Sequence, residues 1–150
     1  MTGWTWDVYG LPAPQGSKTA YVRNGRASLV ESSKELPAWR DSVIYAVRSG
    51  KRPATPLAEP VSVGLRFRFP RPKSHYGKDG GIKPAAASLH TVKPDLDKLI
   101  RGVLDALVIA QVLTDDATVS SIFAEKRYVY PSELPGCTIL VSLPDRIEGD

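Results

Sequence analysis

Aspartates clustered around one apolar segment are the residues of this sequence that could do chemistry. They are Asp95, Asp97, Asp105, Asp115 and Asp116, all within KPDLDKLIRGVLDALVIAQVLTDD. Carboxylate oxygens are the ligands that Mg²⁺ and Mn²⁺ take in proteins, and an ion bound by them can activate water for hydrolysis. Clustered carboxylates also repel one another unless a cation lies between them. The pattern therefore predicts a metal site built from some of these side chains.

Two of the aspartates can converge only if a helix begins between them. Asp95 and Asp97 are separated by one residue, and positions i and i+2 of an α-helix point about 200° apart. Pro94 favours a helix start here, because proline fits the first turn and keeps the residue before it out of the helical conformation. We therefore expect Asp95 to precede the helix and Asp97 to lie in its first turn.

The remaining aspartates lie further along the same segment. Asp97, Arg101 and Asp105 follow one another at intervals of four residues, which places them on one polar edge of the helix. Asp115 and Asp116 come just after it, and a strand running back beside the helix could bring one of them to its start. A structural explanation stays open, because first-turn acids complement the helix dipole and Asp-Asp is common in turns.

The elements that must position these residues follow from hydrophobic periodicity and turn residues. A wide apolar stripe predicts the central helix over residues 96–111, and a second helix is expected over 34–49, with Ser32 or Ser33 as its cap and Pro37 early in it. Alternation predicts strands over 4–10, 61–69, 118–130 and 137–143, and Asn24-Gly25 predicts a hairpin over 21–30. The order indicates a single α+β domain over 1–150, with a mixed or antiparallel sheet backed by two main helices.

Composition narrows the class of protein. The chain has 150 residues, a formal net charge of +4 and an isoelectric point near 9.3, which suit one domain and a negatively charged partner such as nucleic acid. Cys137 is its single cysteine, so an intramolecular disulfide and paired thiolate ligands are excluded. The sequence has neither an apolar run long enough to span a membrane nor an evident export signal. We expect a protein of a reducing cytoplasm.

A basic segment directly precedes the acidic cluster. Between residues 66 and 93 the chain carries seven arginines and lysines against one acid, in a stretch whose part over 70–93 is expected to form a long irregular loop. Such cations hold a DNA backbone through contacts that do not depend on base sequence. The candidates are Lys18, Arg66, Arg68, Arg71, Lys73, Lys93 and Lys98. Arg66 and Arg68 are expected on the polar face of a strand, and some of the charges are expected to be only solvated surface.

Other conspicuous side chains are expected to be structural. Trp4, Trp6 and Trp39 fall at apolar positions of the predicted elements, and Cys137 opens a predicted strand. His75 and His90 lie in the polar loop, where they could act as ligands but are expected to be ordinary surface residues.

The stretch from Lys93 to Val119 resembles the signature region of the RusA family of Holliday-junction resolvases. That pattern has two aspartates separated by one residue, a basic residue four positions after the second, Asp-Ala-Leu on the same helix and a closing Asp-Asp. Here these positions are Asp95, Asp97, Arg101, Asp105-Ala106-Leu107 and Asp115-Asp116. The segments GLPAPQGSKTA and ESSKELPAWRDSV are similar to phage-type members of the family, so the resemblance spans most of the chain.

The resemblance implies a Mg²⁺-dependent endonuclease, with Mn²⁺ as an alternative ion, that resolves four-way DNA junctions by paired symmetric nicks as a homodimer. It implies metal ligands at Asp95, Asp97 and Asp116, with Asp105 and Asp115 supporting them. It also implies action inside a bacterial or phage-infected cell.

Two departures from the family pattern concern basic residues. Lys98 stands where the family usually has asparagine, and Arg101 stands where it usually has lysine. An arginine can stabilise charge in the transition state but cannot carry a proton, so Arg101 is assigned an electrostatic catalytic role. Two other functions stay open: a non-catalytic junction-binding protein, and a nuclease of flaps and other branched DNA.

Overall fold

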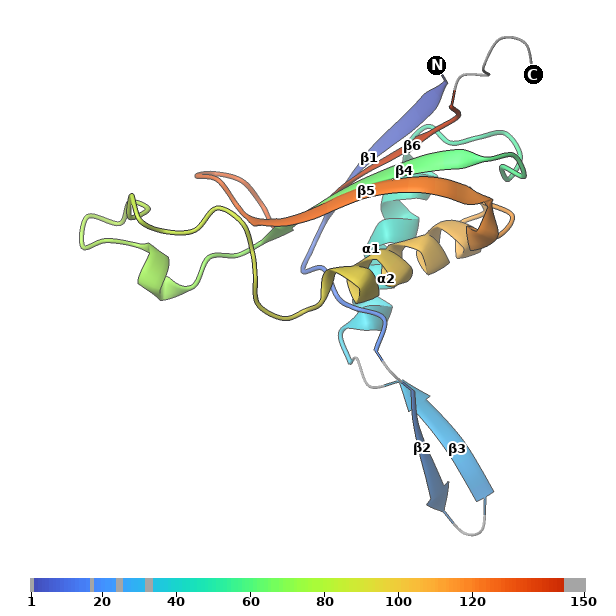
Figure 1. Ribbon diagram of the computed structural model, residues 1–150, viewed down its shortest axis with the longest axis horizontal. Coiled ribbons are helices and arrows are strands. Elements are labelled where there is room, and N and C mark those ends of the chain that lie inside the picture. Colours follow the sequence, from blue (N-terminus) through green and yellow to red (C-terminus); the bar gives the residue numbers. More distant parts are fainter. Residues whose placement is uncertain (1, 17, 24–25, 32–33, 145–150) are drawn as a thin grey trace.

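A four-stranded sheet with two helices forms the body of the protein, in a computed structural model that describes residues 2–16, 18–23, 26–31 and 34–144 (Figure 1). The strands are β1 (Gly3–Tyr9), β4 (Val61–Phe69), β5 (Val119–Tyr128) and β6 (Gly136–Ser142), in the order β1-β6-β4-β5. Strand β6 pairs antiparallel with β1 and β4, and β5 pairs parallel with β4. The predicted α+β domain with a mixed sheet is confirmed.

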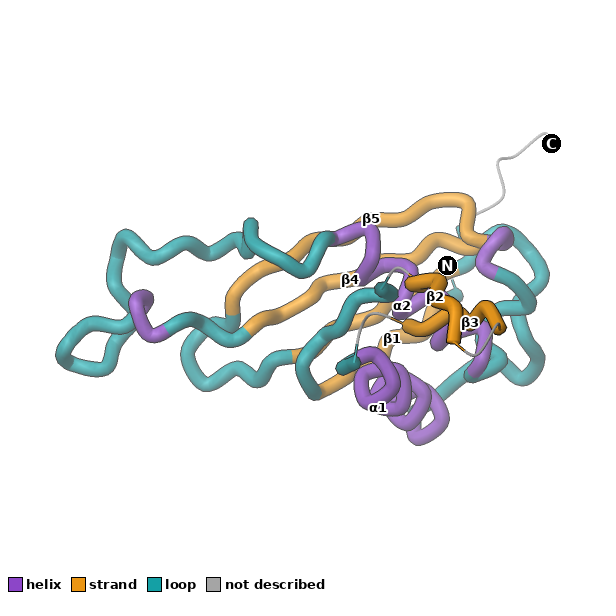
Figure 2. Tube along the Cα trace, turned by 90° about the horizontal axis from the view of Figure 1, so that it is seen from below, coloured by secondary structure: helices purple, strands orange, loops and turns teal. Residues whose placement is uncertain are grey.

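Helices α1 (Leu36–Ser49) and α2 (Leu96–Ile109) pack against the same face of the sheet (Figures 1 and 2). Helix α1 has a proline in its first turn and begins two residues later than predicted, with Glu35 at its N-cap and no side-chain capping hydrogen bond. The serine cap predicted for this helix is therefore wrong, because residues 32 and 33 precede the cap position. Helix α2 ends before Gln111, whose φ of 63° leaves the helical path. Among the described residues, no helix has the length and apolar character needed to cross a membrane.

The hydrophobic core lies between the helices and the sheet. Alternate side chains of β4 face the helices, and Val61, Val63, Leu65 and Phe67 are each at most 2% exposed. Helix α2 contributes its apolar stripe, and the further core residues Trp6, Trp39 and Cys137 are buried as expected. Since burying a side chain of this size stabilises a fold by about 1.5–3 kcal/mol, this contact holds α2 firmly against the sheet.

Two segments extend from this body. Strands β2 (Lys18–Arg23) and β3 (Arg26–Glu31) form a separate antiparallel hairpin that projects away from the sheet in Figure 1. The hairpin is confirmed, although its Asn24-Gly25 turn lies outside the described residues. The long loop after β4 contains the short helix η1 (Lys73–His75) and returns to β5 through a bridge between Leu89 and Arg127. This return places the end of the loop beside the start of α2.

Candidate active site

Asp95 lies just outside helix α2, as Pro94 predicts. Its backbone is extended, with φ −68° and ψ 141°, and Asp97 lies in the first turn of the helix. The two Asp95 carboxylate oxygens accept hydrogen bonds from Lys93 Nζ at 2.8 and 3.0 Å. This contact lowers the pKa of Asp95 and raises the pKa of Lys93. Both side chains are exposed, so the pair contributes charge at the surface rather than much stability.

Lys126 reaches this end of the site from strand β5. Its Nζ donates to the carbonyl oxygens of Pro94 at 2.7 Å and Val92 at 2.8 Å. Burial lowers the pKa of Lys126, and the nearby Asp95 carboxylate opposes that shift. Nothing in the sequence pattern singles out Lys126, because its contact with the start of α2 arises only when β5 packs beside the helix.

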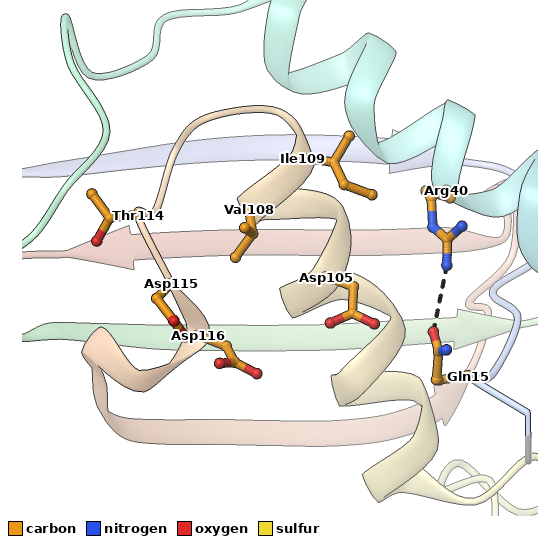
Figure 3. Close-up of a pocket in the computed structure, with 8 residues that line it drawn as sticks. All are labelled: Gln15, Arg40, Asp105, Val108, Ile109, Thr114, Asp115 and Asp116. Atoms are coloured by element: carbon orange, nitrogen blue, oxygen red, sulfur yellow. Dashed lines mark hydrogen bonds between the residues drawn. The ribbon is translucent and has the colours of Figure 1, made fainter.

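Asp116 lies in a separate acidic pocket. The short helix η2 (Asp116–Thr118) contacts α2, and Asp105, Asp115 and Asp116 line a cavity of about 490 Å³ (Figure 3). Asp115 accepts a hydrogen bond from Ala117 N at 2.9 Å, which caps η2. The pKa of Asp116 is raised, first by its hydrogen bond with Asp115, then by burial and by the charges of Asp115 and Asp105. The repulsion between the carboxylates of Asp105, Asp115 and Asp116 is what a bound cation would relieve.

The aspartates form two acidic groups that lie towards opposite ends of α2. One group is Asp95 and Asp97, and the other is Asp105, Asp115 and Asp116. Strand β5 does run back beside the helix, but Asp116 stands at its start, next to Asp105, and Lys126 is the residue that reaches Asp95. The rise from Asp97 to Asp105 is about 12 Å at ~1.5 Å per residue. No three carboxylate, imidazole or thiol side chains of the described residues are grouped closely enough to hold one ion. A single chain therefore does not bring Asp95, Asp97 and Asp116 together.

The donor chemistry nevertheless suits a hard divalent cation. Every candidate ligand is a carboxylate oxygen, and Mg²⁺ is commonly bound through one or two carboxylates, with water and substrate phosphate completing its octahedron. Asp97 and Asp116 are exposed to solvent and accessible to such an ion. The types of residue fit Mg²⁺, whereas the ligand set that the family resemblance implies would draw carboxylates from both ends of α2.

Arg40 and Gln15 also line the acidic pocket, and the sequence pattern does not predict either of them there. Arg40 Nη2 lies 3.5 Å from Gln15 Oε1, the contact dashed in Figure 3, and its Nε is buried with no hydrogen-bond partner in the described part of the chain. Gln15 N donates to Lys98 O at 2.9 Å, which ties the segment after β1 to the start of α2. Arg40 comes from α1, so only the packing of α1 beside α2 makes it a neighbour of Asp105.

The expected cations of α2 lie at its surface. Arg101 is exposed on the helix, between Asp97 and Asp105 in sequence. Lys98 is half-buried, and its charge helps to lower the pKa of Asp95. Both can meet an anion that approaches the Asp95 end of the helix.

The basic residues outside α2 separate into exposed and structural ones. Lys73, Lys93 and Arg66 are exposed, although Arg66 Nε also pairs with Glu125 at 2.7 Å. Arg71 is largely committed to the long loop, because its guanidinium donates to Val129 O at 2.9 Å and to Ala87 O at 2.7 Å. The Lys18 side chain lies outside the described part of the structure.

Arg68 corrects one prediction. It is buried rather than on an exposed polar face, with 4% of its surface accessible. Its Nε donates to Leu134 O at 3.1 Å and its Nη1 to Thr138 Oγ1 at 2.8 Å. Alternation along β4 correctly places Arg68 on the face away from the helices, but the turn before β6 covers that end of the face. The Arg68 side chain thus has a structural role, and its burial leaves little of it accessible to DNA.

The burial of His90 corrects the prediction that it is an ordinary surface residue. It is 7% exposed, and its ring stacks on Phe69 with centroids 4.2 Å apart and an interplanar angle of 23°. The polar sequence around His90 conceals this burial, which results from the hydrogen bond of His90 N to Lys126 O that lays the loop along β5. Its Nδ1 is buried and has no hydrogen-bond partner among the described residues.

Acidic side chains at the two ends of α2, with lysine and arginine side chains nearby on an α+β scaffold, are the residue types that a nuclease uses. The chain belongs to the RusA family, because the family model described as Endodeoxyribonuclease RusA matches residues 12–142. The chain is also 31% identical over 136 residues to a Bacillus subtilis (strain 168) protein described as uncharacterized protein YqaN, with 89% of this chain and 92% of that protein covered. Membership implies an endonuclease of Holliday junctions, and the resemblance seen in the sequence is confirmed.

Proposed function

We propose that this protein is a Mg²⁺-dependent endonuclease that resolves four-way DNA junctions by paired symmetric nicks, with Mn²⁺ able to replace Mg²⁺. The observation that carries the proposal is the pair of acidic groups at the two ends of α2, one bound to a lysine and the other in a pocket that an arginine also lines. Asp95 lies next to Lys93, and Asp116 shares its pocket with Arg40. Anionic ligands for a metal beside cations for a phosphate are what phosphodiester hydrolysis needs.

Different residues of the chain have different roles in the proposed reaction. Asp95, Asp97 and Asp116 would hold the ion, which when bound supplies Lewis-acid activation of water and phosphate. Asp105 and Asp115 keep the surroundings of Asp116 negative. Arg101 keeps its positive charge at any working pH, so it can stabilise the charge that develops on the phosphate.

Exposed basic residues would hold the DNA backbone. Lys73, Lys93, Lys98 and Arg66 are the candidates whose side chains the structure describes as reaching the surface. Contacts of this kind position the duplex and weaken as salt rises. Branched DNA in the cytoplasm of a bacterial or phage-infected cell is the substrate that such an enzyme would meet.

A homodimer follows from two arguments. A four-way junction has two-fold symmetry, so two active sites related by a dyad can make opposed cuts. In addition, one chain does not bring Asp97 and Asp116 together, and a second copy is the simplest source of the missing carboxylate. We propose that the ligands of one ion come from both chains.

Strand β5 offers an edge at which the two copies can meet. It is the last strand of the sheet, and its residues 119–124 carry no charge or proline, while Ile122 and Phe123 are 43% and 65% exposed. Unprotected edges of this kind pair with other strands. Antiparallel pairing of residues 119–123 with the same residues of a second copy would bring that copy's acidic pocket towards the end of β5 that carries Lys126, which lies next to Asp95.

A cleavage assay tests the proposed function. A labelled four-way junction incubated with increasing Mg²⁺ should give paired nicks at symmetric positions, and Asp95→Asn or Asp116→Asn should abolish them while junction binding persists. Linear duplex and flap substrates of the same sequence are the controls. Faster cutting of flaps would indicate a nuclease of other branched DNA. Tight junction binding without cleavage in Mg²⁺ or Mn²⁺ would indicate a non-catalytic junction-binding protein.

A further inference from the structure

A second pocket adjoins the Asp95 end of the site. It has a volume of about 340 Å³ and lies between the segment of residues 11–14 and the end of the long loop. Its walls are mostly apolar, with Phe69 on one side, and Glu35 and Lys93 supply its charged groups. We propose that this base pocket receives one unstacked nucleobase of the DNA substrate. The inference rests on the proposed function, because it takes DNA as the ligand.

The buried edge of His90 argues for a polar planar ligand. His90 lines the base pocket, is 7% exposed, and leaves Nδ1 without a hydrogen-bond partner among the described residues. Buried polar atoms are nearly always paired, so an unpaired one at a pocket points to a ligand that completes it. Burial, and then the charge of Lys126, lower the pKa of His90. The neutral ring that results has one donor and one acceptor nitrogen, which match the donors and acceptors on the edge of a base.

The shape and lining of the pocket suit an aromatic heterocycle. A volume of about 340 Å³ is at the small end of the ~300–1,000 Å³ range of small-molecule sites. Phe69 and His90 already form a stack, and the prolines at positions 12, 14 and 94 offer further flat apolar surface. Proteins hold extruded bases by such aromatic and apolar surfaces, together with hydrogen bonds to one base edge.

The position of the pocket ties its occupant to the proposed cleavage site. Lys93 lines the pocket and also binds the Asp95 carboxylate, and Pro94 lines the pocket directly before Asp95. A base in the pocket therefore belongs to a nucleotide at or beside the phosphate that Lys93 and Asp95 would handle. The base pocket would thus read the identity of a base at the cut, which the backbone contacts cannot do.

Nitrogen-edited NMR of the imidazole groups tests the inference directly, since the chain has only two histidines, His75 and His90. Each of the four deoxynucleoside 5′-monophosphates is titrated into the full protein without metal. We expect saturable shifts of the His90 ring signals, larger for some bases than for others, with His75 unmoved. His90→Phe, which keeps the ring stack but removes the nitrogens, should weaken binding about tenfold, and Leu11→Trp should block the pocket. Leu134→Trp, at an exposed leucine that does not line the pocket, is the matched control.

The outcomes separate this inference from the proposed function. Shifts of His90 in a protein that does not cut junctions would support the base pocket and overturn the nuclease. Junction cleavage by wild type, with His90 signals unchanged at saturating nucleotide, would overturn the base pocket alone. In an active enzyme, His90→Phe should also flatten the distribution of cut positions among junctions that differ only in the bases at the crossover, and an unchanged distribution would count against the inference.

Discussion

Lys126 Nζ lies 2.7 Å from the carbonyl oxygen of Pro94, so the far end of β5 meets the start of helix α2. The near end of the same strand directly follows η2, whose Asp116 shares its pocket with Asp105. Strand β5 thus spans the distance between the two acidic groups and holds them apart. This relationship is why the proposed metal site needs a second chain.

Arg40 should contribute to cleavage although its sequence position does not suggest it. Its guanidinium lines the pocket of Asp116, where a cation can stabilise a phosphate that gains charge. We expect Arg40→Ala to lower the rate of junction cleavage about 10²-fold, with junction affinity changed only a fewfold. Arg48→Ala, at an exposed arginine in the last turn of the same helix, is the control and should leave the rate unchanged. Equal rates for wild type and Arg40→Ala would contradict this assignment.

Arg66 and Arg68 lie two positions apart on β4 but should behave differently. Arg68→Leu removes donors from Leu134 O and Thr138 Oγ1, so we expect a loss of about 1–3 kcal/mol in the free energy of urea unfolding. Arg66→Ala should change stability by less than about 1 kcal/mol, since its pair with Glu125 is exposed.

The same two variants differ in their effect on DNA. For the exposed Arg66, loss of one phosphate contact should reduce the slope of log affinity against log salt by about 0.9. For Arg68→Leu, studied at a temperature where it remains folded, the slope should match that of wild type. A reduced slope for Arg68→Leu alone would mean that the buried guanidinium reaches DNA.

The ion pair of Arg127 and Glu133 makes stability depend on pH. Two hydrogen bonds of 2.6 and 2.8 Å join the side chains, and they hold the pKa of Glu133 at about 2, below its ordinary value of 4.5. Because the pKa is lower in the folded state, the stabilisation is complete above pH 4.5 and is lost as pH falls towards 2. We expect Glu133→Gln to cost about 1.5–3 kcal/mol at pH 7 and less at pH 3, measured by urea unfolding.

Glu125→Gln is the matched control for that experiment. Its partner Arg66 is exposed, so the substitution should have an effect of about 1 kcal/mol or less at both pH values. A cost of Glu133→Gln that is the same at pH 7 and pH 3 would show that the carboxylate's charge is not what stabilises the turn.

Local patterns in the sequence were sufficient to predict most of the elements. The apolar stripe of α2 and the alternation of β4 each indicate directly which face of the element packs on the core. The position of Asp95 outside the helix was also predictable, because Pro94 acts on its immediate neighbours. The resemblance to the RusA family was also visible in the sequence, because the spacing of aspartates along one segment carries it.

Contacts between distant segments were not predictable in this way. Arg40 meets Asp105 only through the packing of two helices, and Arg68 is covered only when the turn before β6 folds over β4. His90 lies in a polar stretch whose composition indicates exposure, yet backbone pairing with β5 buries it. The periodicity of one segment holds no information on such tertiary neighbours, which is also why the distance between Asp95 and Asp116 was open.

Mixed dimers test most directly whether the two acidic groups act together across two chains. Asp95→Asn and Asp116→Asn proteins, each inactive alone, are unfolded together and refolded, and junction nicking is measured. If each site takes Asp95 from one chain and Asp116 from the other, every mixed dimer has one intact site, and random pairing restores about a quarter of the wild-type nicking activity. If each chain builds its own site, both sites of every mixed dimer are defective. Absence of any recovery in a mixture shown to contain mixed dimers would contradict the account.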